Sequence, residues 1–263
     1  QPGIFNGGRA LVWFGSSSGL GSLYNHDDGA DWFASPAVDY AHFGASVATA
    51  GDINGDGYSD LLIGAPDYDG AGITGGIAVA YYGGANNLSQ TAGWTDRFLY
   101  DFSMQGYAVA SAGDVNGDGY ADIMASAPEY DSSYTDEGAV FVWHGSASGP
   151  GVVANWWAHG AQAGAYFGRS IDSAGDVNGD GYSDIIIGAP YYDNGSTDEG
   201  MIFVWLGSPG GLSNSGGSPA NANWKTDSNF YQSYLGTSVA STGDVNRDGY
   251  GDIAAGAPDY ENG

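Results

Sequence analysis

The sequence predicts an all-β protein built from four repeats of a four-stranded antiparallel unit. Two observations lead to this prediction. A nine-residue acidic stretch occurs four times, starting at Asp52, Asp114, Asp176 and Asp244, at spacings of 62, 62 and 68 residues. The 263 residues include 47 glycines and show no helical periodicity, which is typical of many short strands joined by tight turns.

Each acidic stretch reads D-x-N-G-D-G-Y-x-D, except that Arg247 replaces the glycine at position 4 of the last copy. Oxygen side chains at positions 1, 3, 5 and 9, with glycine at position 6, are typical of the opening of an EF-hand calcium loop. We therefore expect about four bound Ca²⁺, one per repeat. Position 4 supplies no side-chain ligand, so the fourth loop is expected to bind as well. The expected ligands are four side chains and the position-7 carbonyl oxygen of each loop: Asp52, Asn54, Asp56, Tyr58, Asp60, Asp114, Asn116, Asp118, Tyr120, Asp122, Asp176, Asn178, Asp180, Tyr182, Asp184, Asp244, Asn246, Asp248, Tyr250 and Asp252.

Four strands are predicted within one repeat. Residues 45–50 are small and β-prone, and residues 61–63 form a short apolar run after the acidic loop. Pro66 ends that run, because proline cannot sit in a central strand. Residues 77–82 and a strand carrying Trp94 complete the unit. Four strands per unit, repeated radially, predict the blades of a β-propeller.

Two rows of aromatic residues keep the period of the repeat, and we expect them in the core or between blades. They are Trp32, Trp94, Trp156 and Trp224, and then Trp13, Tyr81, Trp143 and Trp205, each of the second row followed two residues later by glycine.

The residues that flank the acidic loops carry a family resemblance. Phe43-Gly44 before the first loop and Gly64-Ala65-Pro66 after it resemble the FG-GAP repeat of integrin alpha-subunit propellers and their bacterial relatives. The third copy keeps both motifs, whereas the second and fourth keep them in part. The resemblance implies that the metal loops join the first two strands of each blade on a lower face. It also implies that ligands bind the upper face and that seven blades are usual.

We expect one domain over residues 1–263, with repeat units at about 37–100, 101–162 and 163–230. A fourth unit is split, because residues 237–263 supply its first two strands and residues 1–36 its last two. Three ways of closing the propeller remain open. The chain closes alone as four blades, two chains form a homodimer by exchanging half-blades, or the chain is part of a seven-bladed protein.

Composition excludes several classes of partner. The net charge of −26, with only five Lys and Arg residues, argues against nucleic acid as a partner. The sequence contains no apolar stretch of about 18 residues, so we do not expect membrane insertion. The absence of cysteine excludes disulfides and thiolate metal sites. Calcium loops of this charge fill most readily outside the cell, so we expect a secreted or cell-surface protein.

Recognition is the expected function, through the loops that follow each G-A-P motif. These loops repeat a tyrosine beside acidic residues, and the candidates for ligand binding are Tyr68, Tyr130, Tyr192 and Tyr260. Tyrosines beside carboxylates suit a protein or glycan ligand, but packing between blades is the alternative for their strict repetition. The four histidines show no metal-ligand spacing and no nucleophile motif fits the strand pattern, so we expect no enzyme. The alternatives are a polysaccharide-acting lyase or hydrolase, an accessory domain of one, and a scaffold without its own ligand.

Overall fold

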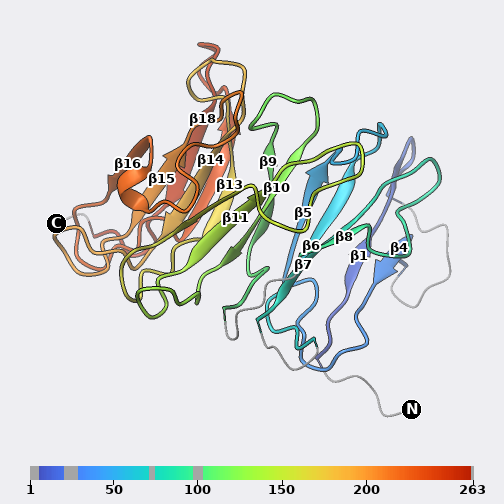
Figure 1. Ribbon diagram of the computed structural model, residues 1–263, viewed down its shortest axis with the longest axis horizontal. Helices are drawn as coiled ribbons and strands as arrows, with labels where there is room; N and C mark the ends of the chain where they lie inside the picture. The colour runs from blue at the N-terminus through green and yellow to red at the C-terminus, as the bar shows by residue number, and fades with distance from the viewer. Residues whose placement is uncertain (1–5, 21–28, 71–74, 97–102, 262–263) are drawn as a thin grey trace.

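The computed structural model describes residues 6–20, 29–70, 75–96 and 103–261, and it confirms the all-β prediction (Figure 1). Within these residues, helical structure is confined to one 3-10 turn, η1 (Pro219–Asn221). None of the described segments forms a helix with the length and apolarity needed to span a bilayer.

Three complete sheets each contain four antiparallel strands in sequence order, as predicted. The first is formed by β5 (Ser46–Gly51), β6 (Asp60–Ala65), β7 (Ile77–Tyr81) and β8 (Trp94–Thr95). The second is formed by β9 (Val109–Gly113), β10 (Asp122–Ala127), β11 (Ala139–Trp143) and β12 (Trp156–His159). The third is formed by β13 (Ser170–Gly175), β14 (Asp184–Ala189), β15 (Met201–Trp205) and β16 (Trp224–Asp227).

Two half-sheets flank the complete sheets. Near the N-terminus, β1 (Ala10–Val12) pairs with β4 (Trp32–Ala34), and a small hairpin joins β2 (Gly15–Ser16) to β3 (Gly19–Leu20). Near the C-terminus, β17 (Ser238–Gly243) pairs with β18 (Asp252–Gly256). By their place in the repeat, β1 and β4 are a third and a fourth strand, whereas β17 and β18 are a first and a second strand.

The sheets fan out from their first strands. Strand β5 contacts β9, β9 contacts β13 and β13 contacts β17, so the first strands form one continuous inner edge. The row of sheets is open, and the two half-sheets lie at its opposite ends (Figure 1). This arrangement is a propeller sector, and the four-bladed ring closed by a single chain is not formed in this structure.

The hydrophobic core lies between neighbouring sheets, and the Trp row helps to join them. The indole Nε1–H groups of Trp32, Trp94 and Trp156 donate to carbonyl oxygens in the next sheet's turn, at Ser89, Gly151 and Ser213, over 2.8 to 3.1 Å. The expected position between blades is therefore confirmed for these three residues. The fourth member, Trp224, is 48% exposed, and among the described residues the sheet after it consists of β17 and β18.

Candidate functional site

The four acidic loops lie at one end of the molecule, at the top of Figure 1. Each joins the first strand of a sheet to the second: β5 to β6, β9 to β10, β13 to β14 and β17 to β18. This is the position that the family resemblance implied for the metal loops.

In the first loop, three backbone N–H groups close a turn around the Asp52 carboxylate. Gly55 and Asp56 donate to its Oδ1 at 2.7 and 3.1 Å, and Gly57 donates to its Oδ2 at 2.8 Å. Asp56 N–H also donates to Asn54 Oδ1 at 3.0 Å, so the oxygens of positions 1 and 3 share a donor. Asn54 Nδ2 donates to Asp56 Oδ2 at 3.0 Å. The side chains of positions 1, 3 and 5 therefore converge on one side of the turn.

The other loops repeat this geometry. The second and third loops form every one of these bonds, and in the fourth Asp248 and Gly249 close the same turn around Asp244. Arg247 adopts a φ of 63°, close to the 73° of Gly55 at the same position of the first loop. A β-carbon at Gly55, Gly117 or Gly179 would overlap the tyrosine ring of the next loop along the row.

The aspartate at position 9 has a different role from the others. Asp60 Oδ2 accepts Ile53 N–H at 3.0 Å within the loop, whereas its Oδ1 accepts Gly83 N–H at 2.8 Å from the segment after β7. Asp122 and Asp184 form the equivalent pairs of bonds in the next two sheets. Burial raises the pKa of Asp122 to about 7 and that of Asp184 to about 6, because backbone hydrogen bonds only partly offset the loss of solvent.

The donor set of each loop suits a hard divalent cation. Every expected ligand atom is an oxygen, and a carboxylate oxygen that accepts one amide hydrogen keeps a second lone-pair site. In the part of the chain that the structure describes, no three His, Cys, Asp or Glu side chains gather closely enough to hold a metal ion on their own. The position-9 carboxylate accepts hydrogen bonds from two backbone amides instead. Since the structure does not bring the described acidic side chains together as a metal site, the calcium ligand set stays a prediction.

The second candidate surface lies at the opposite end, where two sets of loops meet. His42, which precedes β5, has its Nδ1 2.6 Å from Asp67 Oδ2, which follows β6. Gln162, which precedes β13, exchanges two hydrogen bonds with the Asp193 backbone, which follows β14, at 2.9 and 2.7 Å. The segments that enter each sheet and the loops between second and third strands thus form one face, which we call the upper face.

The four predicted ligand-binding tyrosines divide into two groups on this face. Tyr130 is buried against Phe141, with ring centroids 6.2 Å apart, and the half-buried Tyr192 packs on Phe203 at 5.6 Å. Tyr68 is half-buried and packs against the buried cluster that contains Trp32, Phe43 and Ile63. Tyr260 is 43% exposed and meets Phe230 edge-on at 4.5 Å. Tyr130 and Tyr192 therefore make packing contacts within the core. A role in ligand binding stays a prediction for all four tyrosines.

A group of three tyrosines also lies here, and the repeat pattern did not single out two of them, Tyr191 and Tyr234. Tyr191 meets Tyr166 and Tyr234, each with ring centroids 5.3 Å apart. Tyr191 follows Pro190 directly, at a position where the other repeats carry an acidic residue. This departure from the repeat is the sequence feature that could have identified Tyr191 as a candidate. A hollow of 690 Å³ beside this group is lined by Phe230, Tyr231, Gln232, Tyr234, Pro258, Asp259, Tyr260 and Glu261.

Buried glutamates hold two upper-face loops in shape, and sequence reasoning missed them. Glu137 Oε1 accepts the N–H groups of Ser132 and Ser133 at 2.9 and 2.8 Å. Its Oε2 accepts Ala161 N–H at 3.0 Å and lies 2.8 Å from His159 Nδ1. Glu199 accepts two loop amides in the same way. The available signal was the tripeptide Asp-Glu-Gly, which precedes both β11 and β15.

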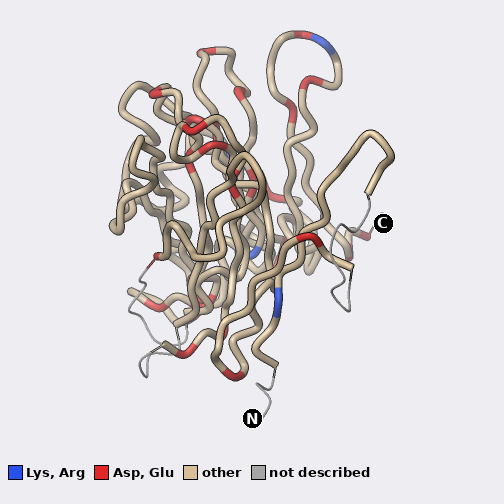
Figure 2. Tube along the Cα trace, turned by 90° about the vertical axis from the view of Figure 1, so that its right-hand side faces the viewer, with Lys and Arg blue, Asp and Glu red and all other residues tan. Residues whose placement is uncertain are grey.

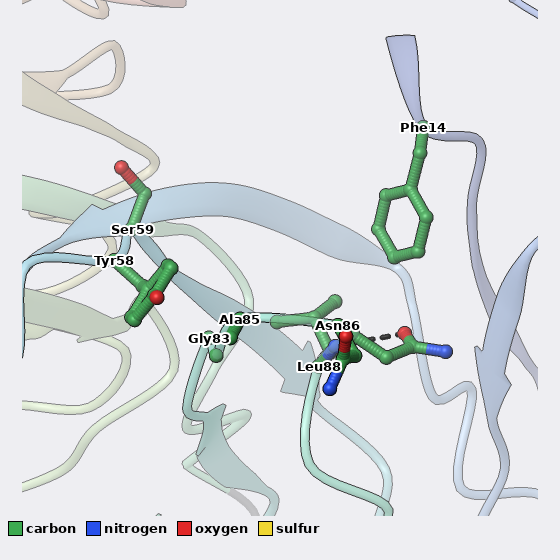
Figure 3. Close-up of a pocket in the computed structure, with 9 residues that line it drawn as sticks. Phe14, Tyr58, Ser59, Gly83, Ala85, Asn86 and Leu88 are labelled. Atoms are coloured by element: carbon green, nitrogen blue, oxygen red, sulfur yellow. Dashed lines mark hydrogen bonds between the residues drawn. The ribbon is translucent and has the colours of Figure 1, made fainter. Parts of the chain in front are cut away.

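A smaller hollow of 260 Å³ lies beside the first acidic loop (Figure 3). Tyr58 and Ser59 line it from the loop, Phe14 from the segment after β1, and Ala85 and Leu88 from the turn after β7. It carries no acidic side chain, so we assign no ligand to it. Acidic residues mark loops at both ends of the molecule, while Lys and Arg are sparse (Figure 2).

Comparisons with known proteins agree with these features. The FG-GAP repeat model matches residues 43–85, 105–143, 167–205 and 235–263. Integrin alpha-V of Gallus gallus is 31% identical over 229 residues, covering 85% of this chain and 21% of its own length. Integrin alpha-5 of Xenopus laevis is 31% identical over 238 residues, which cover 85% of this chain and 20% of the relative's length. Integrin alpha-6 of Homo sapiens is 39% identical over 153 residues, which cover 56% of this chain and 12% of the relative's length. The chain thus spans about a fifth of the length of the first two relatives.

Proposed function

Because this chain belongs to the FG-GAP repeat family, we propose that it is a calcium-stabilised recognition and adhesion module that works outside the cell or at its surface. Its ligand is a protein, bound on the upper face. The observation that carries this proposal is the contiguous group of Tyr166, Tyr191 and Tyr234 beside the 690 Å³ hollow. Tyrosine is a frequent anchor at protein interfaces, because its ring buries area while its hydroxyl stays hydrogen-bonded.

The charge of the upper face favours a basic surface on the ligand. Asp259 and Glu261 line the hollow, and the whole chain carries a net charge of −26. Complementary charge speeds association and rejects acidic partners. A glycan is the second candidate, because aromatic rings beside carboxylates, such as Tyr260 beside Asp259, also suit stacked sugars with hydroxyl groups to hydrogen-bond.

Calcium is proposed as a structural cofactor, one ion per acidic loop. In the first loop the ion takes side-chain oxygens of Asp52, Asn54, Asp56 and Asp60, with the carbonyl oxygen of Tyr58, and the other loops use the equivalent residues. The ion supplies positive charge where carboxylates converge, which offsets their mutual repulsion. The converging turn around positions 1, 3 and 5 supports this assignment.

Binding is tested on an array of extracellular-matrix proteins and a glycan array, with calcium and with chelator. Spots that bind the wild-type chain are then probed with Tyr191→Ala and Tyr260→Ala. Tyr250→Ala is the matched control, because Tyr250 is 48% exposed, similar to the 43% of Tyr260, but lies in an acidic loop at the opposite end. The proposal expects binding to fall with the upper-face variants and to survive in the control. Equal loss in all three variants, or no binding on either array, would contradict it.

We also propose that residues 1–263 act as one propeller domain whose split unit, residues 237–263 plus 1–36, is completed between chains. In this proposal two copies exchange half-sheets and form an eight-bladed ring; the described residues of each copy form three complete sheets and two half-sheets. The placement of the half-sheets at opposite ends of the open row supports exchange over closure within one chain (Figure 1).

A further inference from the structure

A hollow of 320 Å³ lies between the first and second complete sheets, and it shares no lining residue with the acidic loops or with the upper-face hollow. Phe141 and Trp143 line it from β11, and Trp157 lines it from β12. Phe141 pairs directly with Trp157 across the two strands, and Trp143 is two residues along β11, so all three side chains lie on the same face of the sheet. One wall of the hollow is therefore formed by three aromatic rings.

Asp96, which follows β8 of the first sheet, also lines the hollow and is 1% exposed. Its Oδ1 accepts Ala78 N–H at 2.8 Å, and its Oδ2 accepts Gln105 Nε2–H at 2.6 Å. Both donors are uncharged, and none of the described Lys, Arg and His side chains forms an ion pair with Asp96. The hollow therefore contains a buried carboxylate beside aromatic rings, without a cation to balance its charge.

The surroundings of Asp96 hold more hydrogen-bond acceptors than donors. A carboxylate offers about four acceptor sites, of which Asp96 uses two. Gln105 is fully buried, and its Oε1 has no hydrogen-bond partner among the residues that the structure describes. Burial raises the pKa of Asp96 to about 7, because the two neutral donors only partly offset the loss of solvent. Positive charge from a ligand would offset this cost, since buried charges in proteins are normally paired.

The polar pair of Asp96 and Gln105 is a departure from the repeat. At the two equivalent positions the other repeats carry a neutral and an apolar residue: Ala34 with Phe43, Ala158 with Phe167, and Thr226 with Leu235. The register position of Trp157 also varies, and the other sheets place Phe33, Thr95 and Lys225 there. Packing between sheets thus does not require these side chains, and a carboxylate meets three rings at this boundary because of them.

The boundary between the second and third sheets is covered at the equivalent place. The turn between β15 and β16 has 18 residues, against 12 between β11 and β12. This longer turn lies along β12, where Gly217 bridges to Ala158 and Gly216 N–H donates to the Trp157 carbonyl oxygen at 2.8 Å. Ala158 is the equivalent of Asp96, so the shorter turn leaves open the place that the longer turn covers.

We propose that this hollow binds an alkylated ammonium group, with its methyl groups against the three rings and its charge near Asp96. A cation over an aromatic face is attracted electrostatically, and quaternary ammonium ions are typical ligands of aromatic cages. Val152 and Val153, which are 74% and 75% exposed, give the hollow an apolar rim. Its volume is near the lower end of the range of roughly 300–1,000 Å³ that is usual for ligand sites, which suits a small group.

Choline and its neutral analogue 3,3-dimethylbutan-1-ol, in which carbon replaces the charged nitrogen, test the proposal on the wild-type chain with calcium. The indole N–H signals of the eight tryptophans report binding in proton–nitrogen NMR spectra. Choline should move the signals of Trp143 and Trp157, and the neutral analogue should bind at least about 10-fold more weakly. Potassium chloride at equal ionic strength controls for the general attraction of cations to a chain of charge −26.

Two variants test the residues of the site. Trp157→Thr and Asp96→Asn should each weaken choline binding about 10-fold, because the first removes a ring and the second removes the negative charge. Threonine is the residue of the first sheet at this register position, and asparagine keeps the shape of Asp96. Phe33→Thr is the matched control, because it removes a ring at the same register position next to β1. Choline binding should be unchanged in this control.

A second probe distinguishes the source of the ammonium group. A short acetylated peptide that contains trimethyllysine presents the group on a side chain, whereas choline presents it on a free ion. Tighter binding of choline assigns a small free ion, and tighter binding of the peptide assigns a side chain of a protein. Equal binding of choline and its neutral analogue would overturn the recognition of charge. Equal weakening by Phe33→Thr and Trp157→Thr, or unmoved Trp143 and Trp157 signals in excess choline, would overturn the site.

Discussion

The backbone N–H of Gly44 donates to the carbonyl oxygen of Gly64 at 2.9 Å, and this bond joins the two halves of the repeat signature. The same bond links the equivalent residues of the other repeats, at 2.9 to 3.0 Å. Gly64 also lies against the next sheet, where a β-carbon on it would overlap the carbonyl oxygen of Gly106. The glycines of the signature are thus explained by close approach of two backbones, within a sheet and between sheets.

Gly64→Ala should lower the free energy of unfolding by about 1–3 kcal/mol, the usual cost of forcing atoms into a packed interior. Gly210→Ala is the control, because a β-carbon there would meet no atom closer than 4.0 Å. Urea unfolding of the two variants checks the prediction. Equal urea midpoints for the two variants would contradict the prediction, because they would show that the two sheets can move apart at this contact at little cost in free energy.

Glu137→Gln should destabilise the chain by roughly 2–3 kcal/mol at neutral pH, because charged hydrogen bonds between the buried carboxylate and three loop amides are lost. Burial of Glu137 acts against its ionisation, but hydrogen bonds from His159, Ser132 and Ser133 outweigh burial and lower its pKa. Its contribution is therefore present above the unfolded-state pKa and is lost as the pH falls through the folded-state pKa.

Urea unfolding between pH 7 and pH 3 measures this effect. Glu261→Gln is the control, because that carboxylate lies on the exposed upper face. The Glu137→Gln chain should lose less stability on acidification than the wild type. Parallel pH profiles for the two chains would show that the carboxylate charge of Glu137 contributes nothing.

Asp96→Asn should have the opposite pH signature. Asp96 is buried, with hydrogen bonds from Ala78 N–H at 2.8 Å and Gln105 Nε2 at 2.6 Å, and burial raises its pKa to about 7. A raised carboxyl pKa costs stability as the pH rises from the unfolded value to the folded one, by about 4 kcal/mol at most. Asparagine removes this cost, and a flipped Gln105 amide can accept from it through Oε1, which has no hydrogen-bond partner among the residues that the structure describes.

Melting curves at pH 5 and pH 8 in chelator check this prediction, since calcium would otherwise add its own pH dependence. The variant should gain stability mainly at pH 8. A gain of the same size at both pH values would mean that Asp96 does not change its charge in this range.

Much of this architecture could be predicted from the sequence, because the same local pattern of strand and turn residues occurs in all four repeats. Alternating turn glycines and apolar runs located the strands, and the Trp row located the sheet boundaries. The role of position-9 residues such as Asp60 could not be predicted, because its partner Gly83 lies across the sheet and depends on strand register. Tyr191 and Glu137 escaped notice because their roles come from contacts between loops, which the periodic pattern does not encode.

The most direct test of the central claim is the melting temperature of the wild-type chain in excess calcium and in excess chelator, with excess magnesium as the control for charge screening. Four ions that bind only the folded chain should raise the melting temperature by about 20 °C or more, because each site adds stability by mass action. Magnesium should reproduce little of this gain, since it demands a tighter octahedral site. Identical melting curves in calcium and in chelator would contradict the calcium-stabilised propeller.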